Sequence, residues 1–211
     1  MKNNIILLRD LGRKHWLDTF YRMHFFTKNR DFNTVDEIWF VEHYPIFTHG
    51  QIPKKENVIF SHNIPIVQSD RGGQITYHGP GQQVIYFLIN IRRRKMGIRH
   101  LINIMQDVVK DTLNNFLIYA YTQKKLPGVY VKNKKISSIG LRITNGHTLH
   151  GLSLNIDMDL IPFNYIYPCG DRDVKMTQIK DLNCQITVED VKILLIKQLS
   201  YHFQAEIVNI Q

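Results

Sequence analysis

Val84-Ile85-Tyr86-Phe87-Leu88-Ile89 is an uninterrupted run of β-prone apolar residues near the middle of this 211-residue chain. A strand with one face in water alternates apolar and polar residues, whereas a continuous apolar run is typical of a strand that is covered on both faces. The run therefore predicts the central strand of a sheet whose two faces are both covered.

On the C-terminal side of this run, apolar residues recur every three or four positions from Ile98 to Leu117. This spacing places them on one face of a long helix, which we expect to pack on the sheet. Further along, Thr187 and Asp190 have the spacing of a capping arrangement. They open an apolar-periodic stretch that predicts a second helix over residues 188–203.

The remaining elements are predicted from shorter patterns. Aromatic residues near helical spacing predict an amphipathic helix from Gly12 to Thr27. Asn145-Gly146 is a strong hairpin signal. Because hairpins and isolated helices occur without strict β-α-β alternation, the fold class is α+β, and we expect one domain over residues 1–211. Short β-prone runs between turn residues predict strands over residues 5–8, 37–41, 64–68, 128–131, 135–143 and 148–156.

The composition is that of a globular protein, with 44% hydrophobic and 21% charged residues. A chain of this length buries about 70% of the surface that it exposes when unfolded, so a core forms without disulfides or metals. No apolar run approaches the length of a membrane span, and residues 1–10 lack a signal-peptide pattern. We therefore expect a cytoplasmic protein with no membrane segment, in which Cys169 and Cys184 are free thiols.

The charge is strongly positive, because 27 Lys and Arg residues face 18 Asp and Glu residues and leave a net charge of +9. Such an excess attracts acidic partners: nucleic acid, anionic membrane or acidic protein. The densest basic run, residues 92–95, has no interleaved aromatic residues, which argues against an RNA-binding module. It is interpreted either as a solvated turn or as a docking point for an acidic protein.

The segment from Arg71 to Gln82 has the least ordinary composition, with four glycines and a proline in twelve positions. Such a backbone can adopt positive φ angles and approach a ligand closely. The side chains of Arg71, Thr76, Tyr77 and His78 add hydrogen-bonding groups beside it. Neither standard phosphate-loop pattern is present. We therefore interpret the segment as a ligand loop rather than an ordinary turn.

Two further residues could carry chemistry. Lys135 opens an apolar strand, so its ammonium group either reaches out to water or points into a cleft. Cys169 lies between a proline and a glycine, on a rigid exposed bend, and lacks the apolar neighbours of a core thiol. We predict that the Cys169 thiol is accessible, whereas Cys184 has no companion motif. The histidines and cysteines show no pair at ligand spacing, so no metal site is predicted.

Several short motifs occur together along the chain, and they are Arg71-Gly72-Gly73, Thr76-Tyr77-His78-Gly79-Pro80-Gly81-Gln82, Gly128-Val129, Lys135-Ile136, Ile139-Gly140, His150-Gly151, Asn155 and Pro168-Cys169-Gly170. Taken together, these motifs resemble the lipoyl(octanoyl) transferase family over roughly residues 35–185. Ser137 and Ser138 stand where the family mostly has alanines, and Thr48-His49-Gly50 replaces the more usual Thr-Leu-Gly, which could alter the acyl pocket.

The resemblance implies a fold like that of biotin and lipoate protein ligases, with a mixed, mostly antiparallel sheet flanked by helices. It implies transfer of an octanoyl group from acyl carrier protein to a lysine of lipoyl domains, in 2-oxoacid dehydrogenase E2 subunits and the glycine cleavage H protein. Neither ATP nor a cofactor, metal or nucleic acid is implied. The residues implied to line the substrate site are Arg71, Gly72, Gly73, Gln74, Ile75, Thr76, Tyr77, His78, Ser138, Ile139, Gly140, Gly151, Leu152 and Ser153.

By the same resemblance, Cys169 is the nucleophile and holds the acyl group, and Lys135 activates it. The backbone amides around Cys169 and Gly170 are candidates for stabilising the oxyanion, although the sequence does not place them. Two alternatives remain. An ATP-dependent lipoate ligase would need no thiol nucleophile, and a basic nucleic-acid-binding module would be indifferent to replacement of Cys169.

Overall fold

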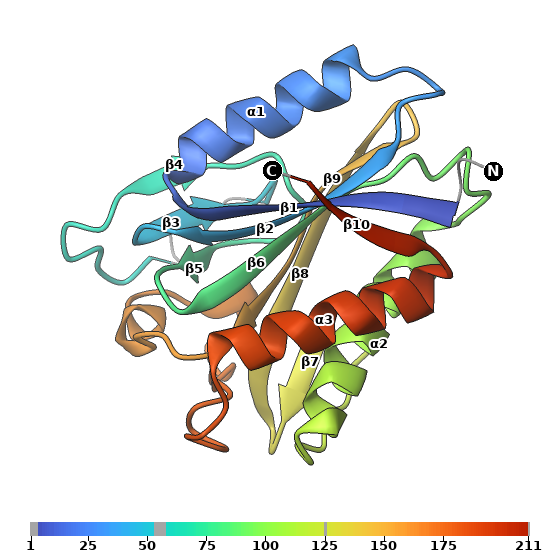
Figure 1. The fold of residues 1–211 in the computed structure, drawn as a ribbon. Coiled ribbons are helices and arrows are strands. Elements are labelled where there is room, and N and C mark those ends of the chain that lie inside the picture. The colour runs from blue at the N-terminus through green and yellow to red at the C-terminus, as the bar shows by residue number, and fades with distance from the viewer. Residues whose placement is uncertain (1–3, 53–57, 125, 211) are drawn as a thin grey trace.

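The computed structural model describes residues 4–52, 58–124 and 126–210, which form a seven-stranded sheet and a three-stranded sheet with helices around them (Figure 1). The strands are β1 (Ile5–Lys14), β2 (Asp36–His43), β3 (Ile46–His49), β4 (Ile66–Gln68), β5 (Thr76–His78), β6 (Gln82–Leu88), β7 (Gly128–Val131), β8 (Lys134–Thr144), β9 (His147–Asn155) and β10 (Glu206–Ile210). The helices are α1 (Trp16–Asn29), α2 (Ile98–Asn115) and α3 (Val188–Phe203), with 3₁₀ turns at Ile161–Tyr165 and Pro168–Gly170.

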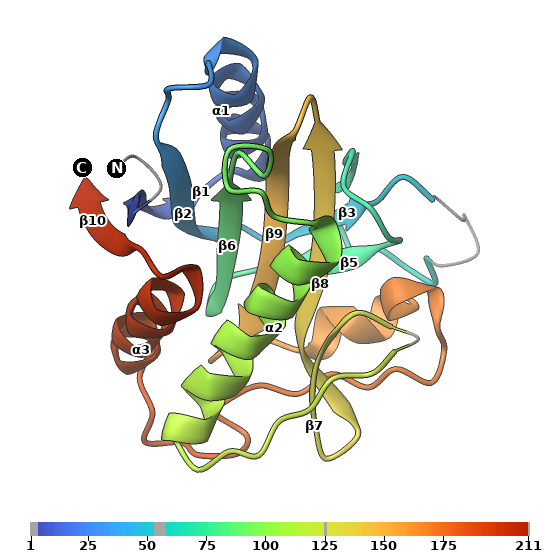
Figure 2. The same ribbon diagram turned by 90° about the vertical axis from the view of Figure 1, so that its right-hand side faces the viewer.

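β6 lies at the centre of the larger sheet, whose strand order is β10-β1-β2-β6-β9-β8-β7. Every residue of β6 is buried, which confirms the prediction made from the apolar run. Ile85 and Phe87 join the core on the side of α2 and α3, whereas Val84, Tyr86 and Leu88 join Met23 of α1 on the other side. The run is apolar throughout because helices cover both faces of the strand (Figure 2).

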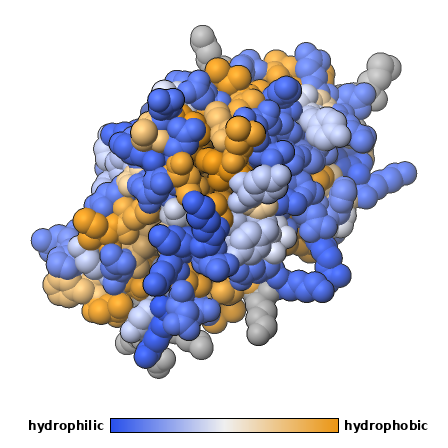
Figure 3. Space-filling view, turned by 90° about the horizontal axis from the view of Figure 1, so that it is seen from below, coloured by the Kyte–Doolittle hydropathy of each residue, from blue (hydrophilic) through white to orange (hydrophobic). Residues whose placement is uncertain are grey.

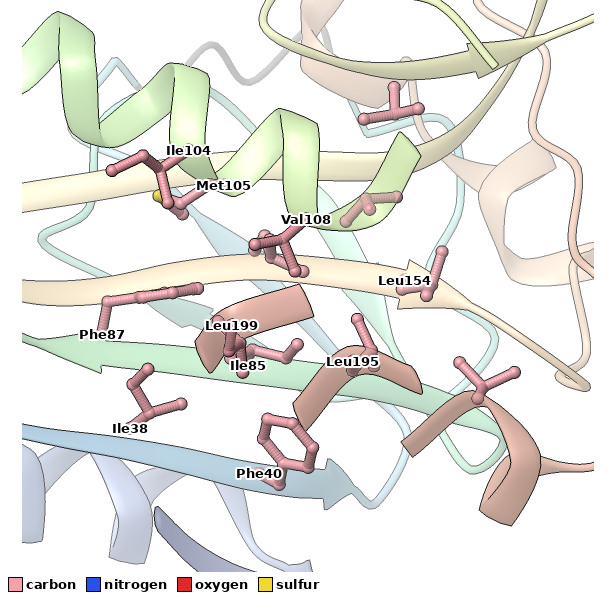
Figure 4. Packing of buried hydrophobic residues seen from close by; sticks show 14 of the residues in the cluster. Ile38, Phe40, Ile85, Phe87, Ile104, Met105, Val108, Leu154, Leu195 and Leu199 are labelled. Atoms are coloured by element: carbon pink, nitrogen blue, oxygen red, sulfur yellow. The ribbon is translucent and has the colours of Figure 1, made fainter. Parts of the chain in front are cut away.

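The largest part of the core fills the space between the sheet and the helices α2 and α3 (Figure 4). The predicted helix over residues 98–117 ends at Asn115, and Leu117 lies beyond it with 89% of its surface exposed. The predicted helix over residues 188–203 has the expected bounds, and Thr187 and Asp190 form a reciprocal capping box at its start.

The pairing of the strands confirms an α+β fold with a mixed, mostly antiparallel sheet. β1 pairs in parallel with β2 and with β10, and the other neighbours in the larger sheet are antiparallel. The sequence patterns did not reveal β10 or the short strands β3 and β5. In the smaller sheet, β3 pairs with β4 in parallel and with β5 in antiparallel orientation.

The start of the helix predicted at Gly12 is wrong, because α1 begins at Trp16. Gly12 lies within β1 at φ +61°, at an irregularity in the pairing between β1 and β2. Beyond it, Arg13 and Lys14 continue β1 opposite Glu42 and His43. The glycine at positive φ therefore allows the strand to pass an irregularity and extend to residue 14 before the helix starts.

The interpretation of residues 92–95 as a solvated basic turn is wrong for Arg93 and Arg94. Both guanidinium groups contact the buried Asp36 carboxylate at 2.6 Å, and Arg30 contacts the same carboxylate at 2.7 Å. These ion pairs connect the segment to Asp36, the first residue of β2. Arg92 and Lys95 are exposed, so only these two of the four could dock an acidic partner.

Within the described ranges, no helix is long and apolar enough to cross a bilayer. Seen from below, the surface carries hydrophobic residues gathered near its middle, with hydrophilic residues around them (Figure 3).

Candidate active site

Cys169 and Lys135, which lie 34 positions apart in the sequence, meet in the folded chain. The Lys135 ammonium group donates a hydrogen bond to the Cys169 sulfur at 3.0 Å. Lys135 is only 1% exposed, so of the two orientations that the sequence allowed, its side chain adopts the one toward the interior. A buried cation in contact with a thiol stabilises the thiolate, which is the reactive form of cysteine.

Several groups hold Lys135 in this orientation. Its backbone bonds to the segment that follows Cys169, through Lys135 N–H to the Lys175 carbonyl at 2.7 Å and Thr177 N–H to the Lys135 carbonyl at 2.9 Å. The ring of Tyr130 lies 5.6 Å from the ammonium group, within the range of a cation–π contact. Gly128 packs against the lysine stem, where a side chain at that position would collide with Lys135.

Cys169 occupies the 3₁₀ turn Pro168–Gly170 at φ +59°, a left-handed conformation that is uncommon for a residue with a side chain. Cys169 is half-buried, whereas the sequence predicted an exposed bend at this position. Cys169 N–H donates to the Ile75 carbonyl at 3.2 Å, and Gly170 N–H donates to the Tyr167 carbonyl at 2.8 Å. Both candidate amides therefore already donate to backbone carbonyls, and neither is free to donate to an oxyanion in this structure.

A cavity of about 490 Å³ surrounds the two side chains. Residues from both sides of the central sheet line it, including Trp16 and Tyr86 on one side and Ile98 of α2 on the other. The sequence patterns did not identify these three as lining residues. The predicted substrate-site residues that line it are Arg71, Gly72, Gly73, Gln74, Ile75, Thr76, His78, Ser138, Ile139, Gly140, Gly151, Leu152 and Ser153.

Tyr77 is the one predicted lining residue that does not line this cavity. It lies in β5, where side chains alternate between the two faces of the strand. Thr76 and His78 face the cavity, so Tyr77 faces away and packs with Phe47 and Phe163 in a separate core cluster. Burial raises the pKa of the Tyr77 hydroxyl to about 12.

The departures from the family pattern fall in different places. Ser138 lines the cavity, whereas the Ser137 hydroxyl is buried with no hydrogen-bond partner among the described residues. In Thr48-His49-Gly50 the residue that departs from the pattern is His49, which does not line the cavity. The matching Thr48 accepts hydrogen bonds from the Arg71 guanidinium at its carbonyl, 2.7 Å away, and at its hydroxyl, 2.9 Å away. Thr48 therefore holds a lining side chain in place.

Two buried histidines next to the cavity are neutral at pH 7. Burial lowers the pKa of His78 to about 3, and it lowers the pKa of His43 to about 4. The Gln82 amide nitrogen donates to Asn155, so its oxygen is the acceptor for His78 Nδ1–H at 2.7 Å. His78 thus has a fixed tautomer, with a proton on Nδ1 and none on Nε2.

A polar cluster that the sequence spacing did not reveal reaches the cavity through His150. The Asp70 carboxylate is 2.5 Å from His150, 3.0 Å from His24 and 3.0 Å from Arg142. Burial opposes ionisation of Asp70, but the hydrogen bond from His150 and the nearby charges outweigh it and lower the pKa of the carboxyl. The two histidines and the aspartate could ligate a metal, although Arg142 already compensates the carboxylate charge.

The buried histidines make the stability of the fold depend on pH. Because their folded-state pKa values lie below about 6.5, the unfolded chain binds protons first as the pH falls, so stability is lost below pH 6.5. We expect His43 and His78 each to lower the free energy of unfolding by about 2 kcal/mol between pH 7 and pH 5. Urea unfolding at both pH values measures this loss. His78→Gln should reduce it, whereas a change equal to that of the exposed control His62→Gln would refute the assignment.

Comparison with known proteins shows which proteins the chain is similar to. The family model described as "Lipoyl protein ligase A/B catalytic domain" matches residues 17–200. An octanoyltransferase of Buchnera aphidicola subsp. Acyrthosiphon pisum is 61% identical over 209 residues, which is 99% of each chain.

Two solved structures show the same fold at low sequence identity. A bipartite lipoate protein ligase from Thermoplasma acidophilum has a TM-score of 0.75 and 16% identity over 99% of this chain and 87% of its own. A biotin protein ligase from Aquifex aeolicus, in complex with biotin and ATP, has a TM-score of 0.58 and 15% identity over 95% of this chain and 70% of its own.

Proposed function

Because the chain belongs to the lipoyl(octanoyl) transferase family, we propose that it transfers an octanoyl group from acyl carrier protein to a lysine of a lipoyl domain through a thioester on Cys169. The observation that carries this proposal is the contact between Lys135 and Cys169 inside the cavity. A thiol beside a buried ammonium group, next to a slot with apolar walls, suits acyl transfer between two proteins.

In the first half of the reaction, the Cys169 thiolate attacks the carbonyl carbon of the carrier thioester. The tetrahedral intermediate collapses, the bond from carbon to the pantetheine sulfur breaks, and that sulfur takes a proton from the Lys135 ammonium group. One thioester replaces another, so the step needs no external energy source. The enzyme then holds the octanoyl group on Cys169, and Lys135 is neutral.

In the second half, the acceptor lysine arrives as an ammonium ion and must lose protons to form an amide. One proton goes to the neutral Lys135 amine, which restores the starting ammonium group, and the other goes to water. The acceptor nitrogen bonds to the acyl carbon, and the bond from that carbon to the Cys169 sulfur breaks. Amide formation from a thioester is downhill, so neither ATP nor a cofactor is required.

The walls of the cavity suit a fatty chain. Ile139 and Leu152 provide apolar side chains, and Gly140 and Gly151 line the cavity beside them. Each methylene that moves from water into such a slot contributes about 0.8 kcal/mol to binding. Chain-length preference should follow the depth of the slot.

The acceptors that follow from this function are lipoyl domains, in 2-oxoacid dehydrogenase E2 subunits and in the glycine cleavage H protein. The net charge of +9 favours acidic protein partners. The two solved structures are ligases, and one of them binds ATP, so ATP dependence is the point that separates the alternatives.

The test is transfer to a purified apo lipoyl domain from two donor systems. With octanoyl acyl carrier protein and no ATP, we expect the lipoyl domain to gain one octanoyl group by intact mass. With free octanoate, ATP and magnesium, we expect no gain. The opposite pattern would identify an ATP-dependent ligase instead.

A further inference from the structure

Arg71 introduces a second cation into the cavity, and this cation has no carboxylate partner among the described residues. Its guanidinium donates to three neutral acceptors, which are the Gly72 carbonyl at 3.0 Å and the carbonyl and hydroxyl oxygens of Thr48. The neighbouring carboxylate, Asp70, contacts His150, His24 and Arg142 instead. A half-buried cation without an anion costs stability, so its presence suggests an anion that forms during the reaction.

The position of Arg71 relative to Cys169 follows from contacts along β8. The stem of Lys135 packs against Gly128, which pairs with Ser138. The stem of Arg71 crosses Gly140, where an added Cβ would lie 3.1 Å from Arg71 Cδ. Ser138 and Gly140 are two positions apart on one strand, which is about 7 Å. The side chains of Lys135 and Arg71 therefore lie near neighbouring positions of β8.

The reaction requires a group that neither Lys135 nor the turn around Cys169 supplies. Both tetrahedral intermediates carry a negative oxygen on the former carbonyl carbon, and hydrogen-bond donors aimed at that oxygen are usually a large part of catalysis. The amides of Cys169 and Gly170 are occupied by carbonyl groups. Lys135 contacts the sulfur and, in the proposed mechanism, transfers protons.

We propose that the Arg71 guanidinium stabilises the oxyanion in both acyl-transfer steps, an inference that rests on the function proposed above. No bond to Arg71 forms or breaks, because the guanidinium only donates hydrogen bonds to the negative oxygen while Lys135 moves the protons. The anchoring of the guanidinium by Thr48 and Gly72 fixes it before the substrate arrives. Burial lowers the pKa of Arg71 to about 10, and nearby Cys169 opposes this effect, so the group remains cationic at pH 7.

The first test compares two reactions of the same sulfur in wild type and in Arg71→Met. Acylation by octanoyl carrier passes through an oxyanion, whereas alkylation by iodoacetamide needs the thiolate but forms no oxyanion at the attacked carbon. We expect the acylation rate to fall about 10²-fold, which is typical for loss of one oxyanion donor. Alkylation of Cys169 should change less than about threefold. Equal losses in both reactions, or an unchanged acylation rate, would overturn the proposal.

The second test measures polarisation of the carbonyl directly in the acyl enzyme. With ¹³C-labelled octanoyl on Cys169, the isotope-edited infrared band of the carbonyl should move to higher frequency in Arg71→Met, because a hydrogen-bonded carbonyl is weakened. Thr48→Val keeps the guanidinium, removes one anchor, and should move the band less. An identical band in wild type and Arg71→Met would contradict the role. If wild type itself gains no acyl group, the proposed function fails rather than this inference.

Discussion

Lys135→Met is expected to slow acylation of Cys169 by octanoyl carrier about 10³-fold, which lies within the range for loss of a general acid and base. The substitution keeps an unbranched side chain of similar length but removes the ammonium group that contacts the sulfur at 3.0 Å. Both the stabilisation of the thiolate and the proton for the departing pantetheine sulfur are then lost. Quenched-flow sampling with intact mass spectrometry measures the rate.

Lys134 provides a matched control because it is the preceding residue on the same strand and is exposed, whereas Lys135 is buried. Lys134→Met removes one positive charge from the surface but none from the cavity, and the acylation rate should stay within about twofold, because exposed charges are screened by solvent and salt. Equal losses in the two variants would mean that general electrostatic attraction, rather than the contact with Cys169, accounts for the effect.

Asp36→Asn is expected to lower the free energy of unfolding by about 3–5 kcal/mol, the usual cost of removing one partner from a buried ion pair. The Asp36 carboxylate is completely buried and is shared by Arg30, Arg93 and Arg94 at 2.6 to 2.7 Å. The amide keeps the shape of the side chain but leaves the guanidinium groups without their anion. Urea unfolding at pH 7 measures the loss.

An exposed ion pair supplies the comparison for this prediction. Asp157 contacts Lys180 at 2.8 Å, with about half of each side chain exposed. Asp157→Asn should change the free energy of unfolding by less than about 1 kcal/mol, as is usual for surface pairs. A loss at Asp36 no larger than the loss at Asp157 would show that the buried cluster is not a stability element.

The parts of the fold that the sequence predicted are those with strong local patterns. β6 was evident from a run of six apolar residues, and α3 was evident from its capping box and apolar period. β5 was hidden because its three residues lie inside a glycine-rich segment that reads as a loop. β10 depends on parallel pairing with β1, whose residues lie 201 positions earlier in the chain, and local patterns carry no information about such pairing.

The site was predicted through motif resemblance more than through spacing. No local pattern indicates that residues 135 and 169 meet, because their contact depends on the pairing of the segment around residue 176 with the start of β8. The ion pairs of Arg93 and Arg94 with Asp36 were not predicted, because a basic run usually lies in water. Asp36 is distant in the sequence, and only the folded chain brings it next to this run. If β5 had been recognised as a strand, the alternation of side chains would have predicted that Tyr77 faces away from the cavity.

The most direct test of an acyl thioester on Cys169 is intact mass spectrometry of the protein after mixing with octanoyl acyl carrier protein, without ATP and without an acceptor. We expect wild type to gain one octanoyl adduct. Peptide mapping should place this adduct on Cys169, and neutral hydroxylamine should release it. Cys169→Ser should carry no hydroxylamine-labile adduct, and Cys184→Ser should be acylated like wild type. A hydroxylamine-labile adduct that persists in Cys169→Ser, or transfer to a lipoyl domain by that variant at the wild-type rate, would contradict this mechanism.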